Sequence, residues 1–396
     1  MRTDSPLKYA GAAATVGAAA FLIAYESESA VVSSMCEVFE RGGVPDWEKE
    51  FFADLAPGVV PRQALQDTLQ ALLYPDSTLA SKSYAVVVGA SGTGKSTAVR
   101  LAVRAVGSSR AKGAVYYLAP TGITSFSTGL MHALHYREPF SLLSPLRRLV
   151  IGEPKDSPDL QSPMPQPVAS WRVLAPVLKA AAARFRARHG RPAVLVLDAM
   201  DLVAKEDPKF FTEVQNFAKE YADKGTLRVV LVFSDGRALP LLQGNSARTR
   251  AVMPLEVGDI SDKEALTFLK ALEVDAVRAE ALVREVAGGR FSLLLEHAPA
   301  AQDVGAIVSM LHNRTDEVLT MARVLPTGQL FRVLLEKGSI SSAVALRLLE
   351  QEKITLLLQS NILVAHPDGK YTFHSRHVES FIARACAEAS ITEVTK

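Results

Sequence analysis

A short apolar run followed by a glycine-rich loop constrains the fold of this chain more than any other feature. Residues 84–88 are Tyr-Ala-Val-Val-Val, and residues 89–96 are Gly-Ala-Ser-Gly-Thr-Gly-Lys-Ser. This loop satisfies the pattern G-x-x-x-x-G-K-[ST], and apolar residues at helical spacing follow it over 97–106, so the context is strand, loop and helix. Its glycines let backbone N–H groups converge on phosphate oxygens without Cβ clashes. A glycine-rich turn that binds nothing is the alternative interpretation.

The residue types of the loop predict how a nucleoside triphosphate and its metal are held. A helix N-terminus carries about half a positive charge and favours a phosphate. We expect Lys95 to reach the β- and γ-phosphates and the Ser96 hydroxyl to hold Mg²⁺. The other loop residues that we expect to bind the nucleotide are Gly89, Ala90, Ser91, Gly92, Thr93, Gly94 and Thr97. ATP and Mg²⁺ are therefore the predicted cofactors.

An acid at the end of a second apolar run is the predicted partner of the loop. Residues 194–197 are Val-Leu-Val-Leu, which fits a strand buried on both faces, and Asp198 follows them. In an open α/β sheet the carboxyl ends of the strands face the ligand. We therefore expect Asp198 to hold Mg²⁺ through a water. The alternative is an aspartate that only caps the next turn.

Five landmarks resemble the P-loop ATPases of the STAND and AAA+ classes, in particular the archaeal-type ATPase family. Two of them are the loop and the acidic strand, and the strand leads into Asp198-Ala-Met-Asp201, in which a second acid follows three residues after the first, similar to a STAND pattern. The resemblance covers residues 58–385. The remaining landmarks are Val59-Val60-Pro61-Arg62 before the loop, the apolar run 227–233 ending at Ser234, and Ala287-Gly-Gly-Arg290 in a helical lid.

The resemblance implies a role for each of these residues. Arg62 belongs to a box near the adenine, Ser234 faces the γ-phosphate as a sensor, and Arg290 lies near the position of a second sensor arginine. Asp201 orients the attacking water, so the implied catalytic residues are Asp201, Asp198 and Ser234. The chain departs from the family at four places: Pro61 replaces a glycine, Ala199 stands where many hydrolytic relatives carry Glu, Phe291 replaces a lid proline, and Arg290 lies one residue closer to its glycine than the usual sensor-2 spacing.

The expected architecture is an α/β P-loop NTPase with a parallel sheet and helices on both faces, followed by a helical lid and a C-terminal winged-helix domain. For the last domain, two short helices, a third near 355–358 and a hairpin over 361–374 predict the winged helix. The predicted divisions are a membrane-anchor or targeting segment 1–30, an extension 31–57, an ATPase core 58–258 with a proline-rich insertion 139–167, a lid 259–325 and a winged helix 326–396.

The N-terminal segment leaves several alternatives open. No charged residue lies between Tyr9 and Tyr25, and such a length is at the short limit for a membrane-spanning helix. Residues 9–25 could anchor the chain in a membrane, form a cleaved targeting segment, form a buried Ala-rich helix or be a tail without structure. The corresponding localisation is intracellular, either anchored in an organelle such as the mitochondrion or cytoplasmic.

The net charge and the cysteine count limit the classes of partner and fold that we expect. The net charge is +2, so there is no general attraction to nucleic acid, and we do not expect nucleic-acid binding. Two cysteines exclude a disulfide-stapled fold. The first hypothesis is an ATP-hydrolysing switch or assembly factor that couples its nucleotide state to a protein partner or to a homo-oligomer. The alternatives are a nucleotide-binding scaffold without turnover, motivated by Ala199, and a P-loop kinase.

Overall fold

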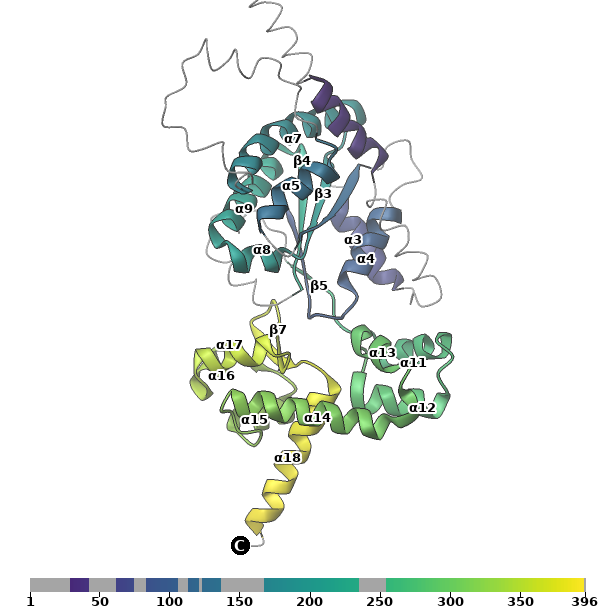
Figure 1. Ribbon diagram of the computed structural model, residues 1–396, viewed down its shortest axis with the longest axis vertical. Coiled ribbons are helices and arrows are strands. Elements are labelled where there is room, and N and C mark those ends of the chain that lie inside the picture. The colour runs from purple at the N-terminus through teal and green to yellow at the C-terminus, as the bar shows by residue number, and fades with distance from the viewer. Residues whose placement is uncertain are drawn as a thin grey trace, which may run out of the picture.

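A five-stranded parallel sheet forms the centre of the N-terminal part of the protein (Figure 1). The computed structural model describes residues 29–42, 62–74, 83–105, 113–120, 123–136, 167–234 and 254–394. The strand order is β2-β3-β4-β1-β5, and every pair is parallel. The strands are β1 (Ala85–Val88), β2 (Ala114–Leu118), β3 (Ala193–Asp198), β4 (Leu227–Val232) and β5 (Leu255–Glu256).

Helices cover both faces of this sheet, as the sequence predicts. Successive strand residues point to opposite faces, so Val86 and Val88 join one core cluster while Ala85 and Val87 join the other. The helices α3 (Gln63–Leu73) and α4 (Lys95–Ala105) pack on one face. The other face carries a helix over 29–41, α5 (Ile123–Ala133), α7 (Pro167–His189), α8 (Met200–Glu206) and α9 (Pro208–Lys224).

A bundle of short helices follows the sheet and has a core of its own; we call it the lid unit. A capping box starts its first helix, because the Ser261 hydroxyl accepts the Glu264 N–H while the Glu264 carboxylate accepts the Ser261 N–H. The elements are α11 (Asp262–Ala271), α12 (Ala276–Leu282), a π-helical turn (Val283–Ala287), α13 (Phe291–His297), a 3₁₀ turn (Ala301–Asp303) and α14 (Val304–Met321).

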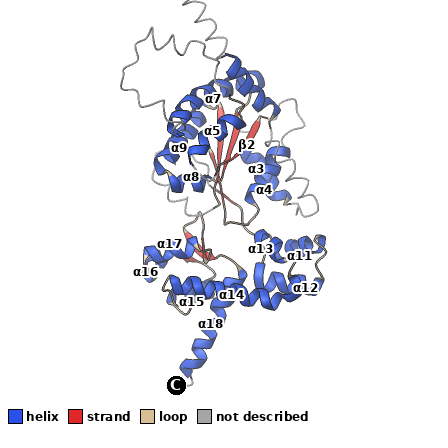
Figure 2. Cartoon of the chain, viewed as in Figure 1, coloured by secondary structure: helices blue, strands red, loops and turns tan. Residues whose placement is uncertain are grey.

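The C-terminal elements, which we call the winged unit, combine helices with a small antiparallel sheet of order β6-β8-β7 (Figure 2). Their order is that of a winged helix: helix, strand, two helices, then a hairpin. The predicted third helix starts earlier than expected, at Gln351. The elements are α15 (Gln329–Lys337), β6 (Ile340–Ser341), α16 (Ser342–Leu348), α17 (Gln351–Gln359), β7 (Leu363–Ala365), β8 (Lys370–Phe373) and α18 (Arg376–Val394).

Several predicted segments lie outside the described residues. They are the uncharged segment 9–25, residues 59–61 of the box before the loop and all but the last residue of the insertion 139–167. Among the helices that the structure does describe, none combines the length and the apolar character needed to cross a membrane.

Candidate nucleotide-binding site

The glycine-rich loop leaves β1 and ends where α4 begins at Lys95, so it has the predicted strand–loop–helix context. Gly92 has a φ of 81°, in the left-handed region that favours glycine. A Cβ at Gly89 would lie 2.3 Å from the backbone oxygen of Val257, and one at Gly92 would lie 1.9 Å from the Ser292 hydroxyl oxygen. The loop therefore has no room for side chains at these two positions, because β5 and the lid unit lie directly against it.

Lys95 is a buried cation in the centre of the loop. Its Nζ donates to the Ala90 carbonyl oxygen at 2.6 Å, so the side chain folds back across the loop. Burial lowers the pKa of Lys95 to about 8, although the charges of Asp198 and Asp201 act in the opposite direction.

The hydroxyl residues of the loop precede and follow Lys95 in the sequence. Ser96 and Thr97 occupy the first turn of α4 and are half-buried. Thr93 is buried, and its hydroxyl donates to the Ala90 carbonyl oxygen at 3.1 Å. Ser96 is therefore placed at the helix N-terminus, where the sequence predicted a metal-binding hydroxyl.

Asp198 is the last residue of β3 and is fully buried. One carboxylate oxygen accepts the Tyr116 hydroxyl at 2.5 Å, and the other accepts the Ala199 N–H at 2.7 Å. Ala199 adopts a left-handed conformation with a φ of 59°, which starts α8 directly after the strand. The carboxylate is thus held from the end of its own strand and from the neighbouring strand β2, and its bond to Tyr116 could not be predicted from the sequence.

The second acid and the predicted sensor residue lie side by side. The Ser234 N–H donates to an Asp201 carboxylate oxygen at 2.9 Å. Both residues line a cavity of about 200 Å³ together with Ala90 and Ser91 of the loop. The winged unit closes the other side of this cavity with β7 residues and His374. The fold thus brings Asp201, Ser234 and the loop together, as predicted.

Arg62 lies on the other side of the loop, just before α3. It donates to the carbonyl oxygens of Thr93, at 3.4 Å, and Gly258, at 3.2 Å, and burial lowers its pKa. The arginine that the resemblance places near the adenine therefore fixes the loop to the segment after β5.

Arg290 joins three parts of the molecule. It forms an ion pair with Asp259, with donor–acceptor distances of 2.5 and 3.0 Å. It also donates to the Ser91 carbonyl oxygen of the loop at 2.9 Å. In the winged unit it donates to the carbonyl oxygen and to Nε2 of His374, at 2.7 and 2.8 Å. This lid arginine contacts the loop, as its predicted position implies, but its hydrogen bonds are made to protein.

His374 of the winged unit lies beside the loop and lines the same cavity as Ala90 and Ser91. Burial and the Arg290 charge lower its pKa to about 3, so the ring is neutral. Since Nε2 accepts from Arg290, the proton lies on Nδ1, which is buried and has no hydrogen-bond partner among the described residues. The sequence could not predict that this donor lies beside the loop, because His374 and Ser91 are far apart in the sequence.

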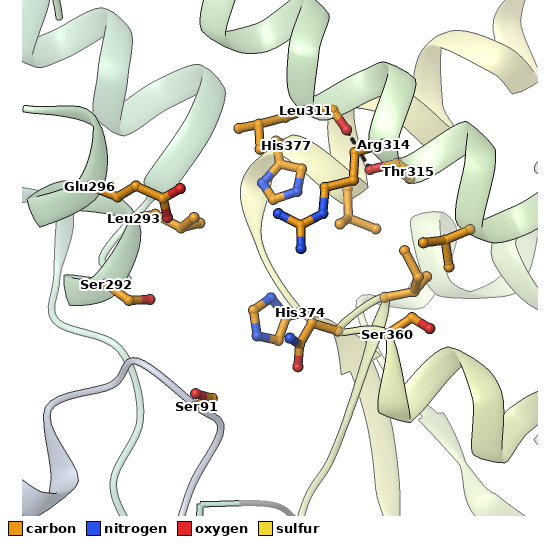
Figure 3. A pocket seen from close by; sticks show the side chains of 14 residues that line it. Ser91, Ser292, Leu293, Glu296, Leu311, Arg314, Thr315, Ser360, His374 and His377 are labelled. Atoms are coloured by element: carbon orange, nitrogen blue, oxygen red, sulfur yellow. Dashed lines mark hydrogen bonds between the residues drawn. The ribbon is translucent and has the colours of Figure 1, made fainter. Parts of the chain in front are cut away.

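A second cavity, of about 240 Å³, lies where the three parts meet. Figure 3 shows Ser91 of the loop, Ser292 of the lid unit and His374 of the winged unit lining it from different sides. His377 and Arg314 line it as well. Polar groups from all three parts therefore converge next to the phosphate-binding loop.

These observations fit a nucleotide with a metal ion. The loop excludes side chains, its lysine is a buried cation, and His374 has an orphaned donor. Ser96 and Asp198 supply hydroxyl and carboxylate oxygens, the donors that Mg²⁺ accepts together with phosphate oxygens. Within the described residues no group of three or more His, Cys, Asp or Glu is placed to hold a metal ion.

Sheet, loop and acid define the fold of a P-loop NTPase. Residues 59–232 match the AAA ATPase domain family. The chain resembles the P-loop ATPases of the AAA+ class and carries a nucleotide-binding ATPase domain of this type. No protein with a curated description matches it.

Among solved structures, the chain is similar to the Walker-type ATPase PABY2304 of Pyrococcus abyssi, with 15% identity over 82% of this chain and 96% of that one and a TM-score of 0.46. It is also similar to the ORC2 protein of Aeropyrum pernix, solved as ADPNP–ADP complexes, with 13% identity, coverage of 85% and 96% and a TM-score of 0.43. The ORC1 protein of the same organism, solved with DNA, has 17% identity, coverage of 87% and 96% and a TM-score of 0.38.

Proposed function

We propose that the protein is an ATP-hydrolysing switch of STAND type, in which the nucleotide state of the loop controls the lid and winged units. The observation that carries the proposal is the Arg290 side chain. It contacts the loop at Ser91, the ion-pair partner Asp259 and the winged unit at His374 at the same time. A phosphate that moves the loop therefore changes the hydrogen bonds of both other units.

The predicted site residues other than Arg62 have roles in this proposal. Lys95 and the amides of residues 89–97 bind the phosphates, and Ser96 and Asp198 hold Mg²⁺, which neutralises phosphate charge when it is bound. Asp201 orients a water, and Ser234 responds to the γ-phosphate. The contact between Ser234 and Asp201 supports this pairing, since a shift of one residue moves the other.

The proposed divisions are the core 58–258, the lid 259–325 and the winged helix 326–396. The first boundary is supported by the apolar clusters, which separate between Val257 and Ile260. The lid and winged clusters separate earlier than residue 325, within α14, because Leu311 belongs to the first and Leu319 to the second. The proposed partner is another protein or a second copy of the chain, bound when the winged unit changes position.

One observation favours the alternative, a nucleotide-binding scaffold without turnover. Ala199 follows the buried acid in a left-handed conformation and carries no carboxylate, so Asp201 is the acid left to orient water. Asn at position 201 keeps an oxygen that can accept the Ser234 N–H but removes the charge. Asp201→Asn thus separates the hydrolytic role of this residue from its structural role.

The test is ADP and ATP binding and ATP turnover by the full chain. We expect Lys95→Ala to abolish binding, and Lys205→Ala, an exposed lysine of α8, to retain it. We expect Asp201→Asn to bind ATP but to lose at least about 100-fold in turnover, within the range of general-base contributions. If Lys95→Ala binds ATP as tightly as the unmodified protein, the phosphate site is refuted. If the unmodified protein binds ATP but does not hydrolyse it, the scaffold hypothesis is supported instead of the switch.

A further inference from the structure

Tyr116 is a buried residue of β2 that the proposed roles above do not use. Its side chain is fully buried, and its hydroxyl donates to Asp198 Oδ2 at 2.5 Å. The strands β2 and β3 are paired in parallel, with Leu118 opposite Asp198. Tyr116 therefore comes from the neighbouring strand and reaches along the sheet to the carboxylate at its edge.

A cation of the loop helix lies over the same tyrosine. The Arg100 guanidinium carbon is 5.0 Å from the centre of the Tyr116 ring, and Arg100 is almost completely buried. Arg100 follows Ser96 by four residues on α4, so the two lie on one face of the helix, one turn apart. The tyrosine thus connects the helix that carries one predicted metal ligand to the strand that carries the other.

The two hydrogen bonds of Asp198 fix the plane of its carboxylate. Oδ2 accepts from Tyr116, and Oδ1 accepts from the Ala199 N–H, so each oxygen keeps capacity for one further donor. Asp198 is also the largest attractive charge acting on Lys95. Without the hydroxyl, the carboxylate is free to turn about its side-chain bonds toward this ammonium group, and away from a metal-bound water.

We propose that Tyr116 is a positioning residue for the Mg²⁺ site: its hydroxyl holds the Asp198 carboxylate in the orientation that accepts a metal-bound water. The inference rests on the proposed nucleotide site. Partners that orient a ligating side chain in this way commonly contribute 10- to 100-fold to metal affinity. The tyrosine itself touches neither nucleotide nor metal in this arrangement.

The chain offers a matched control at the next position. Tyr117 is also buried, and its hydroxyl donates to the Phe126 carbonyl oxygen at 2.9 Å. Successive strand residues point to opposite faces, so Tyr117 belongs to the core cluster away from α4, while Tyr116 belongs to the cluster that contains α4. Phe at either position removes a buried hydroxyl, but only Tyr116→Phe removes a bond to Asp198. Tyr116→Phe also removes the interaction of this hydroxyl with Arg100.

The experiment measures ADP affinity of the full chain in EDTA and over a series of MgCl₂ concentrations. In EDTA we expect wild type, Tyr116→Phe and Tyr117→Phe to bind ADP within about twofold of one another, which also shows that the variants fold. The MgCl₂ concentration that gives half of the Mg²⁺ effect on affinity is expected to rise about tenfold in Tyr116→Phe and to stay unchanged in Tyr117→Phe.

A double-mutant cycle with Asp198→Asn tests whether Tyr116 acts through the acid. We expect Tyr116→Phe to add nothing to the Mg²⁺ requirement of Asp198→Asn, because the shared interaction is already lost. An unchanged Mg²⁺ requirement in Tyr116→Phe, or an equal rise in Tyr117→Phe, overturns the positioning role while the nucleotide site stands. If wild-type protein binds no ADP in either condition, the proposed nucleotide site itself fails.

Discussion

The buried Lys95 makes nucleotide binding depend on pH in a window where an ordinary lysine does not titrate. In the free protein the pKa of Lys95 is lowered to about 8 because burial disfavours its charge. A bound phosphate favours the charged form, so the pKa rises toward the ordinary value of about 10.4. Binding therefore requires the protonated lysine, and affinity falls as the pH rises through 8.

The size of the effect follows from this pKa. At pH 7 about nine-tenths of the free molecules carry the proton, and at pH 9 only about one-tenth do, so the apparent dissociation constant for ADP rises about tenfold between these values. At pH 8 the free lysine is about half protonated and the bound lysine is fully protonated. Each binding event is thus expected to take up about half a proton.

The assay is calorimetric titration of the full chain with ADP in EDTA, at pH 8, in buffers of different ionisation enthalpy. The slope of the observed binding enthalpy against the buffer enthalpy gives the number of protons taken up. The terminal phosphate titrates near pH 6, outside the window. Lys95→Arg keeps its charge throughout, so any residual binding by this variant is expected to be flat from pH 7 to 9. A wild type with no proton uptake and constant affinity refutes the reasoning.

Two further predictions concern the packing around the loop. Gly89→Ala places a Cβ against the Val257 carbonyl oxygen, at 2.3 Å. We expect this variant to lower the free energy of unfolding, measured in urea, by about 1–3 kcal/mol. Gly258→Ala is the control, because nothing lies within 4 Å of its new Cβ, and equal losses in the two variants contradict the steric argument. Arg290→Ala removes a buried guanidinium that bonds to Ser91, His374 and the exposed Asp259, and is expected to destabilise the closed arrangement by about 1–3 kcal/mol, seen as faster hydrogen exchange in β8. Arg284→Ala, which breaks only an exposed pair, should leave exchange unchanged, and so would Arg290→Ala if the winged unit were held by other contacts.

Much of the fold could be predicted because its signals are local. The strands around the loop are continuous apolar runs, which the burial of parallel strands requires. The helix α9 begins and ends where its Asp207 cap and Gly225 indicate. The strand β6 was not predicted, because its two residues give no periodic pattern. The start of α17 at Gln351 was missed because its first turn is polar.

The residues of the candidate site also fall into those that could be predicted from local sequence and those that could not. Residues within one motif, such as Lys95 and Ser96, were predicted from their spacing. Contacts between distant segments were not: Tyr116 and Asp198 are 82 residues apart, and Arg290 and His374 are 84 apart. The sequence shows that a tyrosine or a histidine is present, but only the register of β2 on β3 and the docking of the winged unit determine which atom it meets.

The shared use of Arg290 has a consequence for the kinetics of the protein. If Ser91 of the loop withdrew from Arg290 while the lid and winged units stayed closed, or if the winged unit left alone, the buried guanidinium would lose acceptors and gain none. Half-open intermediates are thereby disfavoured. The loop, the lid unit and the winged unit are expected to separate in one concerted step, with a single opening rate.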